Sequence, residues 1–398
     1  MRDRWPGQHW PGRNYCRKLR SPGSGACSYY GRGCPGPADQ GFQLPDGDVG
    51  QSVNQSRKLF SVCIPAYNRA HHLPALLDSI LAQEFNDYEI VISEDSSPER
   101  SRIAAVVREY SLRHAGLFRY FENPENLGYD GNIRNLVAKA SGEFCFFMGN
   151  DDLMNPGALE TCASILQRYG EVGLILKSYG IFEGTPGHVI QEIRWFKQEK
   201  KFAAGPTAIR FAFRRSGVIS GYVVHRDSAN GAAIDTFDGT LFYQMHLTAS
   251  VLIHKSAVCT PKVLVLCRAG ELPDFGSSSK EKGKYVPGKY TPQARLTMLG
   301  GALAIIRNLK ETKGIDVVDD VIHDYANYFY PYIRDQLNLP LREYYGLYRA
   351  YGRMGFARYP LFHVHCCLDY LLGERRFDAL TNFVRRHLGR SPRLGHSY

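Results

Sequence analysis

The sequence contains no run of about 18 apolar residues, which is the length that a membrane-spanning helix needs. Its first residues are charged and lack the apolar stretch of a secretory signal. The ten cysteines form no Cys-x-x-Cys pair and show no ligand spacing with histidine. We therefore expect a chain that neither spans a membrane nor is secreted, in a reduced, cytosolic setting, without a zinc site or a disulfide framework.

Residues 1–56 have few aliphatic side chains and are rich in Gly, Pro, Arg and Ser. Such a segment buries too little apolar surface to offset the entropy of ordering its backbone. We expect it to be a disordered leader. Its basic and aromatic residues leave a nucleic-acid arm as the less favoured alternative.

The rest of the chain is rich enough in apolar and aromatic residues, 44% and 12% of the sequence, to build a sizeable core. A formal net charge of +10 favours anionic partners, such as phosphorylated ligands, acidic glycans, nucleic acid or a membrane surface. No RNA- or DNA-binding module is recognisable, so we expect no nucleic-acid partner.

From residue 58 onward, strand-like and helix-like segments alternate. Strand-like runs lie at 59–68, 88–97, 118–123 and 143–152, and helix-like runs at 69–83, 103–114 and 129–141. This alternation predicts an α/β fold with a mostly parallel sheet flanked by helices. Ligands bind beyond the carboxyl ends of the strands in such sheets, and the unusual polar residues of this chain follow those ends.

The first two strands end in residues suited to binding a base or sugar ring and its hydroxyl groups. Pro65 fixes the exit of the first strand, which directs Tyr67 and Asn68 toward the crevice. The second strand ends in Glu94 and Asp95, where a carboxylate can accept a hydrogen bond from a base or a ribose. A simple helix cap by the same segment is an equal alternative.

The fourth strand-like run, "EFCFFMGNDD", ends in two adjacent carboxylates, Asp151 and Asp152. Like charges this close repel one another unless a positive group lies beside them. Carboxylate oxygens on a loop are the ligands that Mn²⁺ or Mg²⁺ prefers, with water and phosphate completing the shell. We therefore expect a divalent cation at this position.

Three quoted segments together resemble a known family: "FSVCIPAYNRAHHLPALLDSIL", "YEIVISEDSSPE" and "NLGYDGNIRNLVAKASGEFCFFMGNDDLMNPGALE". They are similar to the nucleotide-binding half of family 2 glycosyltransferases with the GT-A fold, a Rossmann-like α/β architecture. The similarity is strongest to abequosyltransferase-like bacterial sugar transferases of lipopolysaccharide O-antigen assembly. It covers residues 58–165, weakens through residue 275 and is absent from the tail.

The resemblance implies site residues at matching positions. Contacts to the nucleotide sugar are expected from Pro65, Ala66, Tyr67, Asn68, Arg69, Glu94, Asp95, Asn132, Asn150 and Asp151. Asp151 and Asp152 are expected to hold Mn²⁺ or Mg²⁺ against the donor diphosphate. Gly149 stands where the family usually has the first Asp of this motif, so the two acids must share the metal and ribose roles.

A general base is also expected, because an inverting transfer must deprotonate the acceptor hydroxyl. Asp238 is the predicted base and Asp235 the second choice, although an Asp before a Gly is more often a turn or helix cap. Residues 267–290 form a Gly/Ser/Lys-rich segment that could close over the diphosphate, with Arg268 or a lysine on phosphate; a solvated linker is an equal alternative.

The predicted organisation has four parts. The leader, 1–56, precedes a glycosyltransferase domain, 57–275, which comprises a nucleotide-binding half, 57–165, and an acceptor half, 166–275. A flexible loop, 276–290, and a helical region, 291–398, follow. Tyr and Arg are interleaved on these helices, which suits peripheral membrane contact with anionic lipid headgroups or an interface with a partner subunit. Packing on the catalytic domain, with charged outer faces, is the favoured interpretation.

The sequence therefore predicts an inverting, metal-dependent transfer of a sugar from a nucleotide-diphosphosugar to a glycan or lipid-linked acceptor, on the cytoplasmic side of the membrane. The alternative is a catalytically impaired sugar-nucleotide-binding or scaffold protein, which the missing first Asp favours. A nucleotidyltransferase is disfavoured because no Gly-rich phosphate loop follows the first strand.

Overall fold

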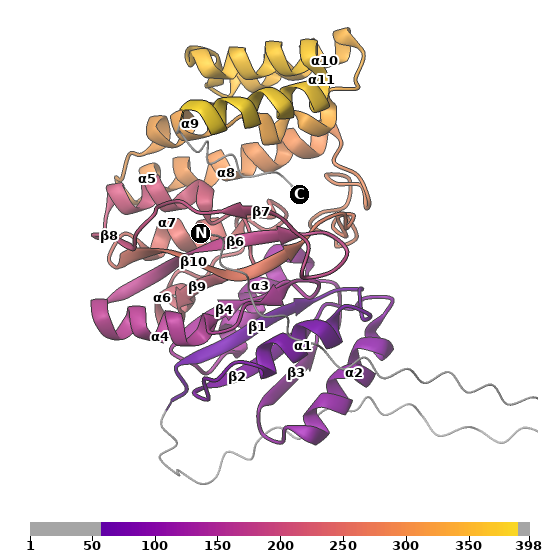
Figure 1. The fold of residues 1–398 in the computed structure, drawn as a ribbon, viewed down its shortest axis with the longest axis vertical. Coiled ribbons are helices and arrows are strands. Elements are labelled where there is room, and N and C mark those ends of the chain that lie inside the picture. The colour runs from indigo at the N-terminus through magenta and orange to yellow at the C-terminus, as the bar shows by residue number, and fades with distance from the viewer. Residues whose placement is uncertain (1–56, 389–398) are drawn as a thin grey trace, which may run out of the picture. The chain divides into compact units, whose positions relative to one another are not determined.

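The structure is a computed structural model that describes residues 57–388. The predicted leader, 1–56, lies outside the described residues, and so does the end of the predicted helical region. Figure 1 shows the order of the elements along the described part of the chain.

Four parallel strands form the first half of the sheet in the order β3-β2-β1-β4, and helices connect them, as the sequence predicts (Figure 1). These elements are β1 (Phe60–Ala66), α1 (Leu73–Leu81), β2 (Tyr88–Glu94), α2 (Arg100–Arg113), β3 (Phe118–Glu122), α3 (Gly128–Lys139) and β4 (Phe144–Phe147). These strands are formed by runs of Val, Ile and Phe, residue types that favour buried strands.

The second half of the sheet continues from β4 in the order β9-β6-β10-β5. Strands β6 and β10 are parallel to one another, β9 is antiparallel to β4 and β6, and β7 and β8 pair with β6 and β10. The elements are β5 (Leu153–Met154), α4 (Ala158–Tyr169), β6 (Val172–Phe182), β7 (Val189–Ile193), β8 (Lys200–Phe202), α5 (Pro206–Arg215), β9 (Tyr222–His225), α6 (Arg226–Gly231), α7 (Tyr243–Val251) and β10 (Ser256–Arg268).

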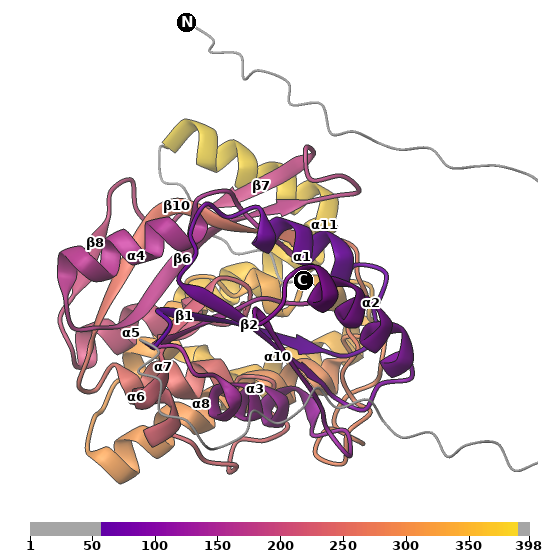
Figure 2. The ribbon, with the colours of Figure 1, turned by 90° about the horizontal axis from the view of Figure 1, so that it is seen from below.

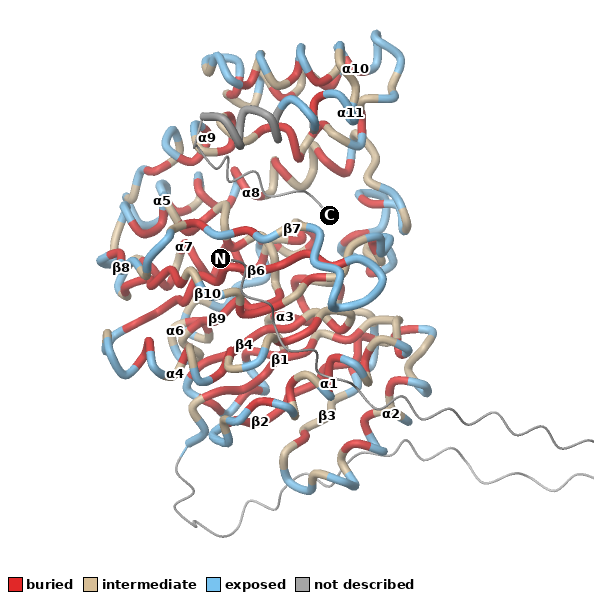
Figure 3. Tube along the Cα trace, viewed as in Figure 1, coloured by how far each residue is buried: buried red, intermediate tan, exposed pale blue. Residues whose placement is uncertain are grey.

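Helices cover both faces of this sheet. Figure 2 shows α1 and α4 on one side of the strands and α3, α6 and α7 on the other. Every residue of β2 and of β6 is consequently buried, and the strands appear red in Figure 3. Sheets buried on both faces read as continuous apolar runs, which explains why the strand segments were recognisable from the sequence.

The C-terminal region is helical, as predicted. It contains α8 (Pro292–Lys313), α9 (Val318–Ala326), η1 (Tyr330–Tyr332), η2 (Arg334–Gln336), α10 (Leu341–Arg353), η3 (Phe356–Arg358) and α11 (Pro360–Leu388), the last interrupted by non-helical backbone at Gly373. Helix α8 begins where the Thr291 side chain accepts a hydrogen bond from the Ala294 N–H, and it ends at Gly314 in left-handed backbone. Among the described residues, no helix has the length and apolar character needed to cross a membrane.

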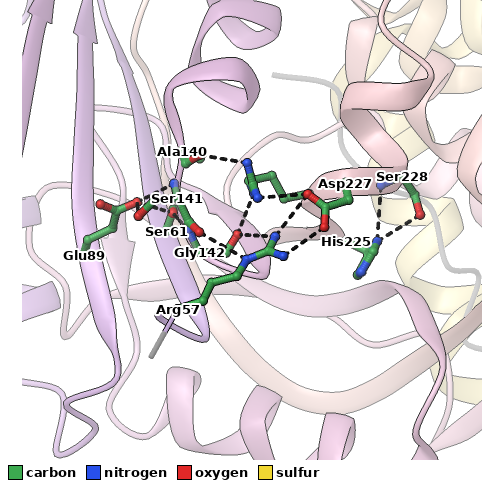
Figure 4. Close-up of polar contacts among 10 residues, drawn as sticks. Arg57, Ser61, Glu89, Ala140, Ser141, Gly142, His225, Asp227 and Ser228 are labelled. Carbon is green, nitrogen blue, oxygen red and sulfur yellow. Dashed lines mark hydrogen bonds and ion pairs between the residues drawn. The ribbon is translucent and has the colours of Figure 1, made fainter. Parts of the chain in front are cut away.

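A cluster of polar contacts joins segments that are distant in sequence at the amino-terminal edge of β1, β2 and β4 (Figure 4). Arg57 donates to the Gly142 carbonyl at 3.0 Å and to Asp227 at 2.9 Å. Glu89 accepts hydrogen bonds from the Ser61 hydroxyl at 2.5 Å and from the Ser141 N–H at 2.7 Å. Because this edge faces away from the carboxyl ends of the strands, we assign the cluster a structural role.

The Glu89 carboxylate should contribute measurably to stability. Burial alone would raise its pKa, but hydrogen bonds from Ser61 and Ser141 and the charge of Arg119 together hold the pKa below its ordinary value. A carboxylate with a lowered pKa stabilises the fold above its unfolded pKa, and that contribution disappears as the pH falls through the folded pKa. Glu89→Gln should therefore lower the free energy of unfolding at pH 7 by about 1–3 kcal/mol, measured by urea denaturation.

The difference between Glu89→Gln and the unsubstituted protein should shrink as the pH falls below about 4.5, the ordinary Glu value, because the carboxyl of the unfolded chain then takes up a proton before the native one; it should vanish once the pH is below the lowered folded pKa. Glu109→Gln is the matched control, since Glu109 lies exposed on α2 in an (i, i+4) pair and should change stability by less than about 0.5 kcal/mol. Equal stability curves for all three proteins at pH 7 would refute the role given to Glu89.

Candidate functional site

A cavity of about 300 Å³ lies beyond the carboxyl ends of β1, β2 and β4. The parallel register places Ala66 opposite Glu94 and Cys63 opposite Phe147, so the segments after these strands meet at one edge. Eight of the residues predicted from the sequence line this cavity: Pro65, Tyr67, Arg69, Asp95, Asn132, Asn150, Asp151 and Asp152.

The turn after β1 directs Arg69 across the cavity. Asn68 and Arg69 both adopt left-handed backbone, with φ of 54° and 57°. Non-glycine residues rarely adopt this conformation, and the Asn68 carbonyl is held there by the Asn150 side-chain amide at 2.9 Å. The strained turn is therefore fixed by the loop that carries the two adjacent acids.

Arg69 supplies positive charge to these acids. Its Nη1 lies 2.5 Å from Asp151 Oδ2, and its Nε donates to Asp274 at 3.1 Å. A third donor, Nη2, reaches the Leu272 carbonyl. Arg69 thus links the loop after β4 to the segment after β10, across the opening of the cavity.

Asp152 lies deeper than Asp151. It accepts hydrogen bonds from the Ser220 hydroxyl and from the Arg268 backbone N–H, the latter at 2.7 Å. Burial and the neighbouring charge of Asp151 raise the pKa of Asp152. The buried Lys177 ammonium on β6 lies in the same electrostatic environment: burial lowers its pKa to about 8, and the charge of Asp152 opposes that change. Arg69 and Lys177 therefore both lie near the paired acids, and so does the Arg268 guanidinium, whose Nε donates to the Asp151 carbonyl at 3.1 Å.

Gly149 leaves room between the oxygens of this loop. A Cβ at Gly149 would lie 3.1 Å from Ser220 Oγ, 3.2 Å from Asp152 Oδ2 and 3.3 Å from Asp151 Oδ1, which is tighter than ordinary contact. Two carboxylates and a hydroxyl thus surround a space that a side chain would fill, and such oxygens fit a hard divalent cation. Within residues 57–388 no group of three or more His, Cys, Asp or Glu side chains gathers as a complete metal site, so phosphate and water would have to complete the shell.

Asp95 holds the start of α3. Its carboxylate accepts hydrogen bonds from Asn123 at 2.8 Å and from the N–H groups of Leu127 and Gly128 at 2.9 and 3.0 Å. Burial, together with the charge of Glu281, raises the pKa of Asp95 to about 6 against these hydrogen bonds. Asp95 therefore both lines the cavity and fixes the start of α3, the helix that carries Asn132.

Comparison with known proteins identifies one segment of the chain. Residues 61–218 match the family model described as glycosyl transferase family 2. This segment is a family 2 glycosyltransferase domain. The match begins in β1 and ends beside the cavity, so it includes the residues after β1, β2 and β4 that line it.

Relatives with a named activity match part of this family 2 domain. The abequosyltransferase RfbV of Salmonella typhimurium is 38% identical over 113 residues, 28% of this chain and 32% of the relative. The poly(ribitol-phosphate) beta-N-acetylglucosaminyltransferase TarS of Staphylococcus aureus is 29% identical over 137 residues, 33% of this chain and 23% of the relative. The chain thus matches about a third or less of the length of these proteins.

The solved structure of TarS residues 1–349 with UDP-GlcNAc superimposes on 80% of this chain and 91% of that chain, with a TM-score of 0.54 and 16% identity. This similarity extends beyond the sequence match and concerns the fold. The expectation of a GT-A fold, an α/β sheet flanked by helices, is confirmed.

Three residues expected to contact a ligand of the family 2 domain do not line the cavity: Ala66, Asn68 and Glu94. Ala66 is buried, and its carbonyl accepts a hydrogen bond from the Asp95 N–H at 2.9 Å. Glu94 is fully buried and accepts hydrogen bonds from the Ser96 and Ser97 N–H groups and from Arg100. The helix-cap alternative for this acidic segment does not describe Glu94, because its carboxylate fixes the turn after β2 while α2 begins later, at Arg100; the ligand alternative fits the position of Asp95.

Asp238, the predicted general base, is also absent from the residues that line the cavity of the family 2 domain. Arg134 on α3 donates hydrogen bonds to both carboxylate oxygens of Asp238, one of them at 2.8 Å. Its neighbours are fixed by Asp130, which accepts hydrogen bonds from the N–H groups of Gly239, Leu241 and Tyr243. In this conformation Asp238 is paired with Arg134 and its side chain is 6% exposed, so its role as a base stays a prediction.

The segment between β10 and α8 contributes acids that the sequence interpretation overlooked. Glu271, Asp274 and Glu281 all line the cavity. Glu271 pairs with His72 at 3.0 Å, and the buried Glu281 accepts from the Tyr129 N–H at 2.7 Å. In the sequence, only Arg268 and the lysines of this segment were considered as ligand contacts. The signal for the three acids was their alternation with Gly and Ser.

The space at Gly149 should be essential to the family 2 domain. Gly149→Ala should lower stability by about 1–3 kcal/mol, because its methyl group would crowd Ser220 and both carboxylates. Thermal denaturation of the purified protein measures this. Gly187→Ala is the matched control, since a Cβ at Gly187 meets no atom within 4 Å. Identical melting temperatures for the two variants would show that the space is not needed.

Proposed function

We propose that this protein is an inverting glycosyltransferase that moves a sugar from a nucleotide-diphosphosugar to a glycan or lipid-linked oligosaccharide. The observation that carries the proposal is the convergence of Tyr67, Asp95, Asp151 and Asp152 on one cavity at the carboxyl edge of the sheet. A ring, a ribose and a diphosphate need an aromatic surface, a hydrogen-bond acceptor and a countercharge, and the cavity provides each of them.

Asp151 and Asp152 would hold Mn²⁺ or Mg²⁺ in the proposed reaction. A divalent cation at this position supplies charge neutralisation for the departing diphosphate. Arg69, now paired with Asp151, would lose that partner to the cation, which leaves its guanidinium next to the phosphates. The Arg268 backbone N–H keeps Asp152 oriented from the side of β10.

Inversion requires a base near the acceptor hydroxyl. Asp238 would fill this role only after release from Arg134. The carboxylates of Asp274 and Glu271 are also paired, with Arg69 and His72, but they line the cavity and their side chains are 39% and 35% exposed, which favours them over Asp238. We propose that the base belongs to the segment between β10 and α8.

The relatives support a role in surface polysaccharide assembly. One is named as an abequosyltransferase, and another is named as a beta-1,3-glucosyltransferase that acts on GalNAc(5)-diNAcBac-PP-undecaprenol. By analogy we propose a glycan or lipid-linked acceptor of O-antigen type for this chain. The proposed location is the cytoplasmic face of the cell membrane, where such donors and acceptors meet.

A sugar-nucleotide-binding protein without transfer activity is the second candidate. Two observations favour it: glycine occupies position 149, where an Asp is usual, and Arg69 already neutralises Asp151. Release of nucleoside diphosphate from the donor distinguishes the two candidates, because only an enzyme cleaves the sugar–phosphate bond.

Metal-dependent donor binding should depend on Asp151. With Mn²⁺ or Mg²⁺ present, one member of a panel of nucleotide sugars should stabilise the protein by about 2.7 kcal/mol at 100 times its dissociation constant. Asp151→Asn should abolish this shift and the release of nucleoside diphosphate, measured by thermal denaturation and a nucleotide-release assay. The control Asp87→Asn, at an exposed position before β2, should behave as the unsubstituted protein.

Binding without release would support the second candidate. A panel in which no nucleotide sugar shifts the melting temperature would overturn both. An Asp151→Asn protein that still responds to the metal and the donor would remove the proposed metal site.

We further propose that the first part of α11 contacts the membrane surface. Its exposed residues Leu361, Val364, Leu368 and Leu371 recur every three or four positions, which places them along one face of the helix. Exposed arginines also occur at Arg342, Arg349 and Arg353 on α10 and, after the break at Gly373, at Arg375 and Arg376 on α11. An apolar stripe on a helix pair that also carries exposed cations would suit contact with anionic lipid headgroups.

Leu371→Glu should weaken cosedimentation with vesicles of phosphatidylglycerol and phosphatidylcholine about tenfold, because a leucine that enters the lipid is replaced by a negative charge. Leu112→Glu is the matched control, as Leu112 is equally exposed but lies on α2. Equal vesicle binding by the two variants would remove α11 from the membrane contact.

A further inference from the structure

A second cavity of about 210 Å³ adjoins the first. Five residues line both cavities: Tyr129, Gly217, Val218, Phe275 and Tyr290. Its far wall comes from α5, from α8 and from the 3-10 helix η1, which belong to other parts of the chain than the paired acids. A molecule in the second cavity would therefore meet a donor in the first across a shared boundary.

Three buried arginines line the second cavity: Arg214, Arg215 and Arg295, whose side chains are 7%, 8% and 5% exposed. Asp324 on α9 pairs with both Arg214 and Arg215, and Asp335 pairs with Arg295. Three guanidinium groups face two carboxylates, so this group of five carries one positive charge in excess. No Asp or Glu of the described residues lines the cavity itself.

Arg215 has a donor without a partner. Its Nη1 donates to the Phe211 carbonyl and to Asp324, both at 2.8 Å, and its Nη2 donates to Asp324 at 3.1 Å. Its Nε is buried and has no hydrogen-bond partner among the described residues. A buried, charged N–H without an acceptor is costly, which favours a ligand that supplies one.

Aromatic rings complete the cavity. Trp195 and Tyr332 line it, and the Arg215 guanidinium lies 5.3 Å from the centre of the Trp195 ring. Tyr290, on the shared boundary, lies under Arg295, 3.9 Å from its guanidinium carbon. Flat rings beside fixed cations suit a ligand with both an apolar sugar face and a negative charge.

We propose that the second cavity is an acceptor subsite that binds a sugar or polyol carrying an oxyanion, phosphate or carboxylate, through Arg215. The role as acceptor subsite rests on the proposed glycosyl transfer, because it takes the first cavity to be the donor site. The excess positive charge selects anionic acceptors, and the shared boundary brings their hydroxyl groups to the donor.

Titration calorimetry with glucose 6-phosphate, glucuronate and glucose tests the proposal. The full chain is titrated with and without a saturating nucleoside diphosphate, so that the donor cavity is filled in one arm. An anionic sugar should bind at least about tenfold more tightly than glucose in both arms. The phosphate and carboxylate probes identify which oxyanion the cavity prefers.

Arg215→Met should weaken binding of the anionic sugar about tenfold to a hundredfold and leave nucleotide binding unchanged. Asp324 keeps Arg214 as a partner in this variant. Arg215→Lys keeps the positive charge and removes the Nε donor, which provides a second test should the Met variant not fold. Arg210→Met is the matched control, since Arg210 lies on the same helix but is exposed and pairs with Asp320.

The proposal is overturned if glucose binds as well as the anionic sugars, if no anionic sugar binds to protein that binds nucleotide, or if both Arg215 variants bind like the Arg210→Met control. Absence of nucleotide binding in every protein would sink the proposed transfer activity and with it the role as an acceptor subsite. The titrations without nucleotide would then still decide whether Arg215 binds oxyanions.

Discussion

The repulsion between Asp151 and Asp152 is the constraint on which the site depends. Two carboxylates at the end of a buried strand need cations nearby, and the fold brings Arg69 from the turn after β1 and Lys177 from β6. Arg69 can reach only because its turn adopts left-handed backbone, held by Asn150 from the acid-bearing loop itself. The nearby cations and the left-handed turn at Arg69 are thus both linked to the loop that carries the two acids.

The fold of the first half was readable from the sequence for a simple reason. A strand covered by helices on both faces is apolar throughout, so β1, β2 and β4 stood out as continuous Val, Ile and Phe runs, each followed by an abrupt change to polar residues. The helical C-terminal region was also recognisable. Strand β9, by contrast, is four residues long and lies between β4 and β6 in the reverse direction, which local patterns do not reveal.

The site was predictable where a residue's role follows from its position at a strand end, and unpredictable where it follows from a distant partner. Asp95 and Glu94 are adjacent in sequence, yet Glu94 is buried and accepts hydrogen bonds from the turn after β2, while Asp95 lines the cavity. Asp238 was predicted to be the base from its place along the chain, but in the structure Arg134, 104 residues away, donates hydrogen bonds to its carboxylate. No local pattern contains that contact.

The same reasoning explains why the C-terminal helices matter to the site. Asp324 on α9 receives hydrogen bonds from two arginines of α5, and Arg295 on α8 stacks on Tyr290 at the boundary of the two cavities. Since η1 and α8 also supply Tyr332 and Met298 to the second cavity, the helical region forms a wall of the site. This wall lies outside the residues that match the family model, 61–218, so variation there can change the acceptor while the donor half keeps its chemistry.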